Sequence, residues 1–298
     1  MNIVVLGSGS MGSFFGGMLS KKNNVVLVGR KNHVNKINKN GLKIQGKTQL
    51  EIKIKAVEQI KEINFIPDLV LLTVKAFDTE QALNQMKPFF HKDTILLSFQ
   101  NGLDNFERIK QFIPEEQIIL GITSHGVQFT NPGIVVHQGI GSTVIGELSK
   151  KEAVRVKKIA SIFSDSGIAI EISQDILKDV WKKAIVNASI NPLTAIFSCN
   201  NGYLLKNPIL AYLVDKICRE SVFVAHRQGY SFSSEEMLQI TNKVIMDTEH
   251  NFSSMFQSIQ QGKRTEIDQI NGKISEIGIS NGCNVALNLL LTKIIKSL

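Results

Sequence analysis

The sequence predicts an α/β Rossmann-type N-terminal domain followed by an all-α C-terminal domain. The chain has 298 residues, enough for two domains of about 150 residues each. Apolar strand-like runs alternate with helical stretches in its first half. Strand signals nearly vanish after about residue 174. We therefore expect one domain over residues 1–174 and a second, helical domain over residues 175–298.

The first half contains the predicted sheet. Near-continuous Val, Ile and Leu is typical of parallel strands covered by helices on both faces. Such runs occupy Asn2–Gly7, Asn24–Gly29, Leu69–Val74, Thr94–Ser98 and Ile118–Gly121. Helices are expected over Met11–Ser20, Thr79–Met86 and Val154–Ser164. The glycines and β-branched runs of Gly126–Gly146 predict hairpin strands that close the sheet, and a last strand is expected at Ile168–Ile172.

The second half carries helical periodicity almost throughout. The expected helices are Asp175–Ser189, Pro208–Gln228, Ser234–Glu249, Thr265–Asn281 and Val285–Lys296. Pro208 suits a first helical turn, where its missing N–H costs nothing. Ser233 and Ser234 followed by two glutamates are typical of a helix N-terminus, because serine caps and acids favour the first turn.

Composition excludes several classes of protein. Hydrophobic residues make up 43% and charged residues 20%, which is globular composition and too apolar for a disordered chain. Three cysteines (Cys199, Cys218 and Cys283) are too few for a disulfide scaffold or a four-cysteine zinc site. The sequence offers no convincing metal cluster, so we expect no metal.

The net charge of +8 raises the question of an anionic partner. The excess is mostly lysine, spread along the chain without a basic arm and without interleaved aromatic residues, so we do not expect nucleic acid. No apolar run approaches the roughly 20 residues of a membrane span, and no leader precedes the strand-like run Ile3–Leu6. We expect a cytoplasmic monomer or homodimer with free thiols.

The first informative motif follows the first predicted strand. Gly7, Ser8, Gly9, Ser10, Met11 and Gly12 form a G-x-G-x-x-G that opens a predicted helix. Its glycines permit a tight turn, close approach to a pyrophosphate and close helix packing, and the helix N-terminus supplies amide donors. A glycine-rich turn without a ligand is the alternative, but the position at the start of a βαβ unit favours dinucleotide binding.

The end of the second predicted strand indicates which dinucleotide. NAD-binding units usually carry an acid there for the ribose 2′-hydroxyl. This chain has Arg30 and Lys31 instead, which suit a 2′-phosphate, so NADPH is favoured over NADH. The alternative is that Arg30 is only a solvated loop residue.

Two further residues follow predicted strands. Lys75 comes directly after Val74, and Asn101 stands in the segment Gln100-Asn101-Gly102. Ligands of open parallel sheets lie beyond the carboxyl ends of the strands, so both side chains are candidates to face a cofactor and a substrate. Taken alone, each is equally compatible with an ordinary turn, since Asn-Gly is a common turn pair.

A polar stripe runs along an otherwise apolar helix. Lys183, Asn187 and Asn191 are spaced by four residues and therefore share one helical face. Burying such groups is costly unless each has a partner, so the stripe is expected to line a cleft, with a solvated face as the alternative. Pro192 is expected to end or bend the helix near Asn191.

These segments together resemble the ketopantoate reductase (2-dehydropantoate 2-reductase) family. The resemblance runs along essentially the whole chain in the family's order. It rests on Gly7–Gly12, Val74–Ala76, Gln100–Gly102, Trp181–Ala195, Ser254-Met255, and Arg264-Thr265-Glu266-Ile267-Asp268 followed by Asn271-Gly272. The Lys-x3-Asn-x3-Asn-Pro-Leu-Thr-Ala and Thr-Glu-Ile-Asp segments are specific, whereas many dehydrogenases share the glycine motif. One departure is Ser258, where the family often has Asp.

The resemblance implies an activity and a set of roles. Family members reduce 2-dehydropantoate to (R)-pantoate with NADPH, on the path to pantothenate and coenzyme A. Lys183 matches the family's general acid, and Glu266 its carboxylate that contacts substrate and lysine. Lys75 and Asn101 match positions near the nicotinamide and substrate. The matching substrate-cleft positions are Asn187, Asn191, Asn201, Asn251 and Ser254, with Ser254 matched to the substrate carboxylate.

Three other functions remain open on the sequence. A sibling reductase would use the same residues on another 2-keto acid, because a scaffold determines chemistry better than substrate. A non-catalytic NADP-binding protein is disfavoured by the intact Lys183 and Glu266. A basic nucleic-acid module is the most remote.

Overall fold

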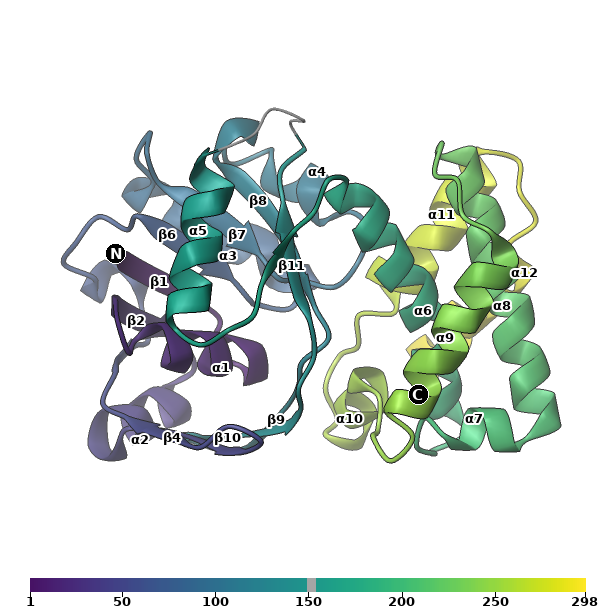
Figure 1. The fold of residues 1–298 in the computed structure, drawn as a ribbon, viewed down its shortest axis with the longest axis horizontal. Coiled ribbons are helices and arrows are strands. Elements are labelled where there is room, and N and C mark those ends of the chain that lie inside the picture. Colours follow the sequence, from purple (N-terminus) through teal and green to yellow (C-terminus); the bar gives the residue numbers. More distant parts are fainter. Residues whose placement is uncertain (149–153) are drawn as a thin grey trace. The chain divides into compact units, whose positions relative to one another are not determined.

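The computed structural model describes residues 1–148 and 154–298. It forms two compact units (Figure 1). The first unit comprises residues 1–100 and 105–176, and the second comprises residues 101–104 and 177–298. This division reflects only how the residues pack within each unit. The cofactor role of residues 1–174 and the substrate role of residues 175–298 stay predictions.

The main sheet of the first unit has eight strands in the order β12-β11-β8-β7-β6-β1-β2-β5. The strands are β1 (Asn2–Leu6), β2 (Asn24–Val28), β5 (Lys55–Val57), β6 (Leu69–Leu72), β7 (Ile95–Ser98), β8 (Ile118–Thr123), β11 (Thr143–Gly146) and β12 (Glu171–Ile172). All neighbours pair in parallel except β8 and β11. Strand order reverses at β1, which lies between β2 and β6. The predicted α/β Rossmann-type architecture is confirmed.

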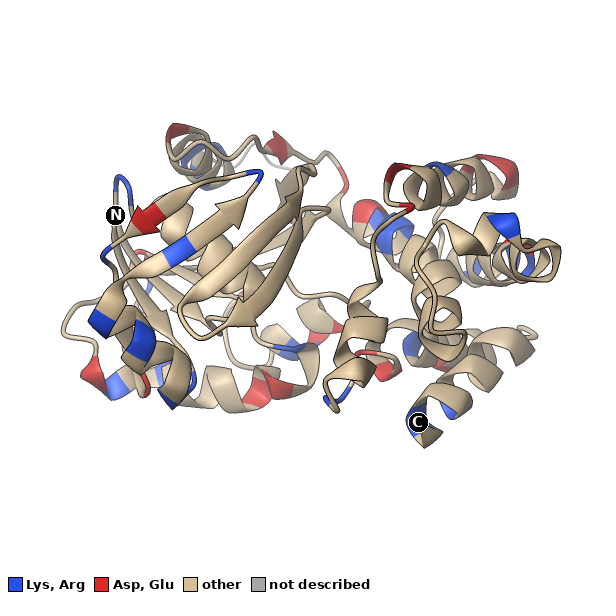
Figure 2. Cartoon of the chain, turned by 90° about the horizontal axis from the view of Figure 1, so that it is seen from below, with Lys and Arg blue, Asp and Glu red and all other residues tan. Residues whose placement is uncertain are grey.

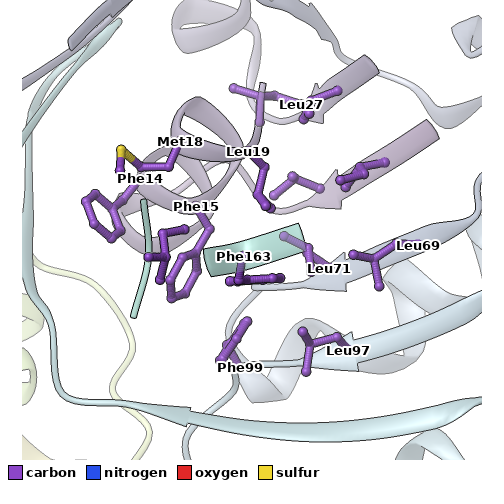
Figure 3. Packing of buried hydrophobic residues seen from close by; sticks show 14 of the residues in the cluster. Phe14, Phe15, Met18, Leu19, Leu27, Leu69, Leu71, Leu97, Phe99 and Phe163 are labelled. Carbon is purple, nitrogen blue, oxygen red and sulfur yellow. The ribbon is translucent and has the colours of Figure 1, made fainter. Parts of the chain in front are cut away.

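Helices and a hydrophobic core complete the first unit. The helices are α1 (Ser10–Leu19), α2 (Lys31–Asn40), α3 (Thr79–Met86), α4 (Asn105–Ile109) and α5 (Val154–Asp165). Figure 3 shows Phe15 of α1, Phe99 after β7 and Phe163 of α5 packed together. The ring centroids of Phe15 and Phe99 are 4.5 Å apart, and those of Phe15 and Phe163 are 5.6 Å apart. This aromatic cluster fixes α1, the helix that the glycine motif opens, against the sheet.

Two predictions for the first unit were wrong in part. The hairpin β9 (Gly126–Asn131) and β10 (Ile134–Gly139) does not close the main sheet. It forms a second sheet with β3 (Leu42–Gly46) and β4 (Leu50–Ile52), in the order β4-β3-β10-β9. The cause is a long-range parallel pairing of β10 with β3. Only β11 of this region joins the main sheet, and the strand expected over residues 168–172 is reduced to β12.

The second unit is helical, as predicted. Its helices are α6 (Ile176–Ile196), which begins at the last residue of the first unit, α7 (Tyr203–Lys206), α8 (Pro208–Arg227), α9 (Ser234–Asp247), α10 (Ser254–Gln260), α11 (Lys273–Ser280) and α12 (Ala286–Ser297), with a π-helix over Asp268–Gly272. Side chains cap three of them: Asn207 accepts from Ile209 N and Leu210 N, and Ser233 and Ser253 each accept from the N–H three residues on. The apolar faces of α6, α8 and α9 form the core.

Two helix predictions in this unit need correction. Of the two effects expected of Pro192, an end or a bend, the end is contradicted, since α6 continues through Pro192 to Ile196. The helix expected over Thr265–Asn281 begins later, with the π-helix at Asp268 and then α11. Lys and Arg lie interspersed with Asp and Glu along the ribbons of both units (Figure 2). Within the described residues, none of the helices combines the length and apolar character needed to cross a membrane.

Candidate active site

The glycine loop joins β1 to α1 in the first unit. The first three N–H groups of the loop make hydrogen bonds within the protein. Gly7 N and Ser8 N both donate to Val28 O (3.1 and 2.9 Å), and Gly9 N donates to Gly7 O. Helix α1 begins at Ser10, and the first amide with a partner inside the helix is Ser13 N, which donates to Gly9 O. The N–H groups of Ser10, Met11 and Gly12 therefore point out of the helix start and suit an anion.

Backbone conformation and close packing explain why the first and last residues of the motif are glycines. Gly7 has φ +100°, a left-handed conformation that favours glycine. A Cβ atom at Gly12 would collide with the Gly7 carbonyl oxygen and lie 2.6 Å from Thr73 Oγ1. Thr73 Oγ1 itself lies 3.0 Å from Leu6 O and 2.9 Å from Gly7 O, and donates to these carbonyls. The loop is thus held from the end of β6, by a residue that sequence reasoning missed.

A buried chain of hydrogen bonds supports the same loop. Gly133 N donates to His33 Nδ1 (2.9 Å), so the neutral ring carries its proton on Nε2. His33 Nε2 then donates to Ser13 Oγ (3.0 Å), and Ser13 Oγ donates to Ser8 O (3.0 Å). Burial lowers the pKa of His33 to about 4, which keeps the ring neutral near neutral pH. This chain connects α2 to the glycine loop, and its long-range partners were not visible in the sequence.

Arg30 lies close in sequence to this loop. It is the residue before α2 and is exposed. It follows Val28, whose carbonyl accepts from the glycine-loop amides, by two residues. The guanidinium is therefore carried by the segment that leaves the sheet beside the glycine loop. No acid occupies residues 29–33.

Lys75 stands at the N-terminal end of a short 3₁₀-helix, Ala76–Asp78. Gln100 holds that segment, because its Nε2 donates to Val74 O (2.9 Å) and Thr79 Oγ1 (2.8 Å). Ser98 Oγ donates to Gln100 Oε1 at 3.1 Å. The Gln100 amide oxygen and both amide protons thus have partners, and the side chain holds the Val74 carbonyl before Lys75 and the Thr79 hydroxyl after it.

The second unit contains a charged pair. Lys183 on α6 and Glu266 before the π-helix interact through charge, and Glu266 is 6% exposed. Burial lowers the pKa of Lys183 to about 8, while the Glu266 carboxylate acts in the opposite direction. Asn101 belongs to this unit, and its Nδ2 donates to Glu266 Oε2 (3.3 Å). The structure thus brings Lys183, Glu266 and Asn101 together.

The remaining candidate residues lie in the same unit. Asn187 is partly exposed and Asn191 is 7% exposed, both on the helix of Lys183. Asn201 and Asn251 are neighbours, since Asn201 N donates to Asn251 O (2.9 Å), and Asn201 Nδ2 donates to Thr248 Oγ1 (2.8 Å). The family resemblance named both Asn201 and Asn251 as substrate-cleft positions, but no sequence pattern predicted that they pair with each other.

Ser254 is the exposed first residue of α10. Its neighbour Ser253 caps α10, and Thr194 Oγ1 of α6 lies 2.8 Å from Ser253 Oγ. This contact joins the start of α10 to the end of the Lys183 helix. Ser258, the departure from the family pattern, donates to Ser254 O (2.9 Å) and so bonds within its own helix turn.

The chemistry available in these two sets of residues differs. The first unit offers amide donors at a helix start, with Arg30 and Lys75 as cations. The second offers an ammonium and a carboxylate with hydroxyl and amide donors. In the part of the chain that the structure describes, no group of three His, Cys, Asp or Glu side chains could hold a metal ion. Proton transfer and anion binding are within reach of these side chains, whereas a hydride has to come from a cofactor.

Comparison with known proteins gives consistent matches over the chain. Residues 3–150 match the model of ketopantoate reductase PanE/ApbA, and residues 175–298 match that of its C-terminal part. A 2-dehydropantoate 2-reductase of Pyrococcus horikoshii is 37% identical over 298 residues, covering 100% of this chain and 97% of the relative. One of Archaeoglobus fulgidus is 31% identical over 295 residues, covering 99% and 96%.

Solved structures agree. A D-mandelate dehydrogenase in complex with NADH and anilino(oxo)acetate is 30% identical, with a TM-score of 0.94 and coverage of 100% of this chain and 98% of that one. The 2-dehydropantoate 2-reductase of Geobacter metallireducens is 25% identical, with a TM-score of 0.91 and coverage of 100% and 99%.

Proposed function

Because the chain belongs to the ketopantoate reductase family, we propose that it reduces 2-dehydropantoate to (R)-pantoate with NADPH. The observation that carries the proposal is the charged pair of Lys183 and Glu266 on the helical unit. Desolvation lowers the pKa of the half-buried Lys183 to about 8, so its ammonium is charged at neutral pH and can still give up its proton. That combination suits the reduction of a ketone, in which the carbonyl oxygen must gain a proton.

The glycine loop and Arg30 would hold the cofactor. The amides of Ser10, Met11 and Gly12 suit the pyrophosphate, Gly9 leaves room for it, and Gly7 and Ser8 form the turn before it. Arg30 would pair with the 2′-phosphate, the group that distinguishes NADPH from NADH. When bound, the nicotinamide supplies the hydride. The NADH bound in the matched D-mandelate dehydrogenase structures supports a pyridine nucleotide, and Arg30 supports NADPH.

Lys183 would protonate the substrate oxygen. Negative charge grows on that oxygen as the keto carbon is reduced, and a nearby ammonium both stabilises the charge and donates the proton. Glu266 favours the charged form of Lys183 and would also contact the substrate. Asn101, which donates to Glu266, would help to orient that carboxylate, and Lys75 would lie near the nicotinamide.

Hydrogen-bond donors would hold the substrate. Ser254, at the first turn of α10, would bind the carboxylate, because a hydroxyl at a helix start adds to the local amide donors. Asn187, Asn191, Asn201 and Asn251 would bind the remaining oxygens. A carboxamide can both donate and accept, which suits a substrate with a hydroxyl and a keto group.

A second candidate function rests on one comparison. The D-mandelate dehydrogenase of the matched structure is bound to NADH and anilino(oxo)acetate. This supports a sibling activity, the reduction of another branched or aromatic 2-keto acid by the same side chains. A non-catalytic NADP-binding protein is a weaker alternative, because both charged residues are present.

The test is a rate assay with two cofactors and several substrates. NADPH or NADH oxidation is followed with 2-dehydropantoate, other branched 2-keto acids and phenylglyoxylate, the keto acid that corresponds to mandelate. The proposal expects the highest kcat/KM for NADPH with 2-dehydropantoate. Its lactone, which has no free carboxylate, is the matched control and should react poorly. No oxidation with any acid would exclude the reductase, and a preference for phenylglyoxylate would favour the sibling activity.

A further inference from the structure

Pro192 leaves a carbonyl without its usual helical partner. In a regular α-helix the Ala188 carbonyl accepts from the N–H of residue 192, and proline has no N–H. Helix α6 nevertheless continues through Pro192 to Ile196. The buried Asn271 Nδ2 donates to Ala188 O at 3.1 Å. A side chain far along the chain thus supplies a donor where the helix itself cannot.

Asn271 is held firmly in this position. It is completely buried, and its Nδ2 also donates to Asn288 Oδ1 (2.9 Å). Asn288 Nδ2 in turn donates to Glu220 Oε1 (2.8 Å) and Ser221 Oγ (3.2 Å). Both protons of the Asn271 amide therefore have acceptors, and α8 and α12 fix the direction of the side chain.

The hydrogen bond joins the two segments that carry the charged pair. Ala188 follows Lys183 by five residues, and Asn271 follows Glu266 by five residues. Ile270 N donates to Glu266 O (3.2 Å), so the turn after Glu266 is closed by its own backbone bonds. Both connections are short, one along α6 and the other through the turn that leads into the π-helix, and a shift at the hydrogen bond would therefore move Lys183 relative to Glu266.

The same turn also carries the Asn101 segment. Leu103 N donates to Gln269 O at 3.2 Å, two residues before Asn271. Asn101 Nδ2 reaches Glu266 from this segment. The π-helix Asp268–Gly272 is thus a common support for Asn101 and Glu266, and π-helical turns often occur at functional sites.

We propose that Asn271 is a positioning residue that sets the separation of Lys183 and Glu266, and that Pro192 provides the acceptor by freeing the Ala188 carbonyl. Asn271 acts through the backbone and is not a catalytic residue. The proposal rests on the proposed function for its kinetic test, and it also makes a prediction about Lys183 that needs no activity.

The first test replaces Asn271 by alanine. The variant loses the donor to Ala188 O, so Glu266 is displaced from Lys183. We expect kcat to fall about 10–100-fold, the range found when a supporting hydrogen bond is lost, with an unchanged KM for NADPH. The basic limb of the kcat pH profile should move below the value of about 8 expected for Lys183, because the attraction that favours its charged form weakens.

Asn281→Ala is the matched control. Asn281 Nδ2 also donates to a backbone carbonyl, that of Ile277 at 2.8 Å, but at the exposed end of α11. This variant should keep the wild-type kcat and pH profile. If Asn271→Ala lowers only the melting temperature and leaves kcat and the pH profile at wild-type values, Asn271 is merely structural and the proposal is wrong.

A second variant covers the case in which Asn271→Ala does not fold. Pro192→Ala returns an N–H to the helix and gives Ala188 O a competing donor without emptying the core. It should shift the pH profile in the same direction, by less. An unchanged profile in this variant overturns the role given to Pro192.

A direct titration separates this proposal from the proposed function. The ¹³Cε signal of Lys183, assigned by comparison with Lys183→Arg, is followed against pH in the protein without cofactor. The proposal expects a lower midpoint in Asn271→Ala than in the wild type. An equal midpoint overturns the proposal even if the enzyme is active, whereas a shifted midpoint in a protein inactive with every 2-keto acid overturns the proposed function alone.

Discussion

The two units hold their candidate sites by different physical means. In the first unit the glycine loop is fixed by neutral groups: the His33–Ser13 chain, Thr73 and the backbone of β2. In the second unit the half-buried Lys183 ammonium and the buried Glu266 carboxylate interact through charge. The first arrangement costs little desolvation, whereas the second is stable only because each charge has a partner.

The difference follows from what each site is proposed to bind. A polyanionic cofactor brings its own charge, so the loop needs donors in fixed positions and empty space rather than buried ions. Proton transfer needs a group whose pKa is shifted toward working pH, and burial beside a carboxylate achieves this for Lys183. Changes at the glycine loop should therefore affect cofactor binding, and changes at the charged pair should affect turnover.

The largest expected effect is that of removing the ammonium. Lys183→Ala should lower kcat by about 10²–10⁴-fold, the usual contribution of a general acid, and leave the dissociation constant of NADPH unchanged. Lys182→Ala, which removes the exposed neighbouring lysine, is the control and should behave as wild type. The readouts are steady-state kinetics and a fluorescence titration with NADPH. Near-normal turnover would remove Lys183 from the mechanism.

The pH dependence of the wild type follows from the same residue. Lys183 must be protonated to act as an acid, and its pKa is lowered to about 8. We therefore expect kcat to hold below pH 8 and to fall as the pH rises through about 8. An enzyme whose kcat stays constant up to pH 10 would use another proton donor.

The next effect separates two glycines of one loop. A Cβ at Gly12 would collide with the Gly7 carbonyl, so Gly12→Ala should lower the stability by about 1–3 kcal/mol and weaken NADPH binding. A Cβ at Gly9 would have no atom within 4 Å, so Gly9→Ala should leave the melting temperature unchanged and weaken only the binding of NADPH. Calorimetry and NADPH titration measure both quantities. Normal NADPH binding by Gly9→Ala would place the pyrophosphate elsewhere.

An effect confined to one cofactor is expected at the 2′-phosphate. Arg30→Ala removes one charge-assisted contact, worth about 1.5–3 kcal/mol, so kcat/KM for NADPH should fall roughly 10–100-fold while that for NADH changes little. Lys36→Ala, at an exposed position of α2, is the control and should leave the ratio of the two cofactors as it is. Equal losses with both cofactors would mean that Arg30 does not contact the 2′-phosphate.

Local patterns in the sequence were enough for the central strands of the main sheet and for the long helices of the second unit, but not for the edge strand β5 or the short helices α7 and α10. The β3–β10 pairing was not predictable, because it joins segments about 90 residues apart. Helix α2 was also missed, since its run of Lys and Asn buries only His33, Val34 and Ile37. In both cases the deciding contacts are tertiary, and a local pattern carries no record of them.

The same distinction applies to the candidate site. The resemblance to a family singled out Lys183 and Glu266, but no pattern indicated that Asn271 donates to Ala188, a residue 83 positions away. The rule that proline ends a helix failed at Pro192 in a helix that Asn271 supports from outside. A local rule thus fails at the point where a distant side chain supplies a donor for the freed carbonyl.

The smallest effect concerns the neutral support of the first unit. The pKa of His33 is lowered from 6.5 to about 4, so between these values the unfolded chain binds a proton that the folded chain does not. Stability should therefore fall as the pH falls from 6.5 toward 4. His33→Gln keeps a donor toward Ser13 without a titrating ring, and its melting temperature should fall less over this range than that of the wild type. We expect a difference of roughly 2–4 °C, the shift that about 1 kcal/mol produces in a protein of this size.

His125 and His137, whose pKa values burial also lowers, remain in both proteins and cancel in the comparison. The exposed His91→Gln is the control and should keep the wild-type slope. Parallel curves for wild type and His33→Gln would mean that His33 is not held neutral in the fold, and the contrast between a neutral first site and a charged second one would then fail.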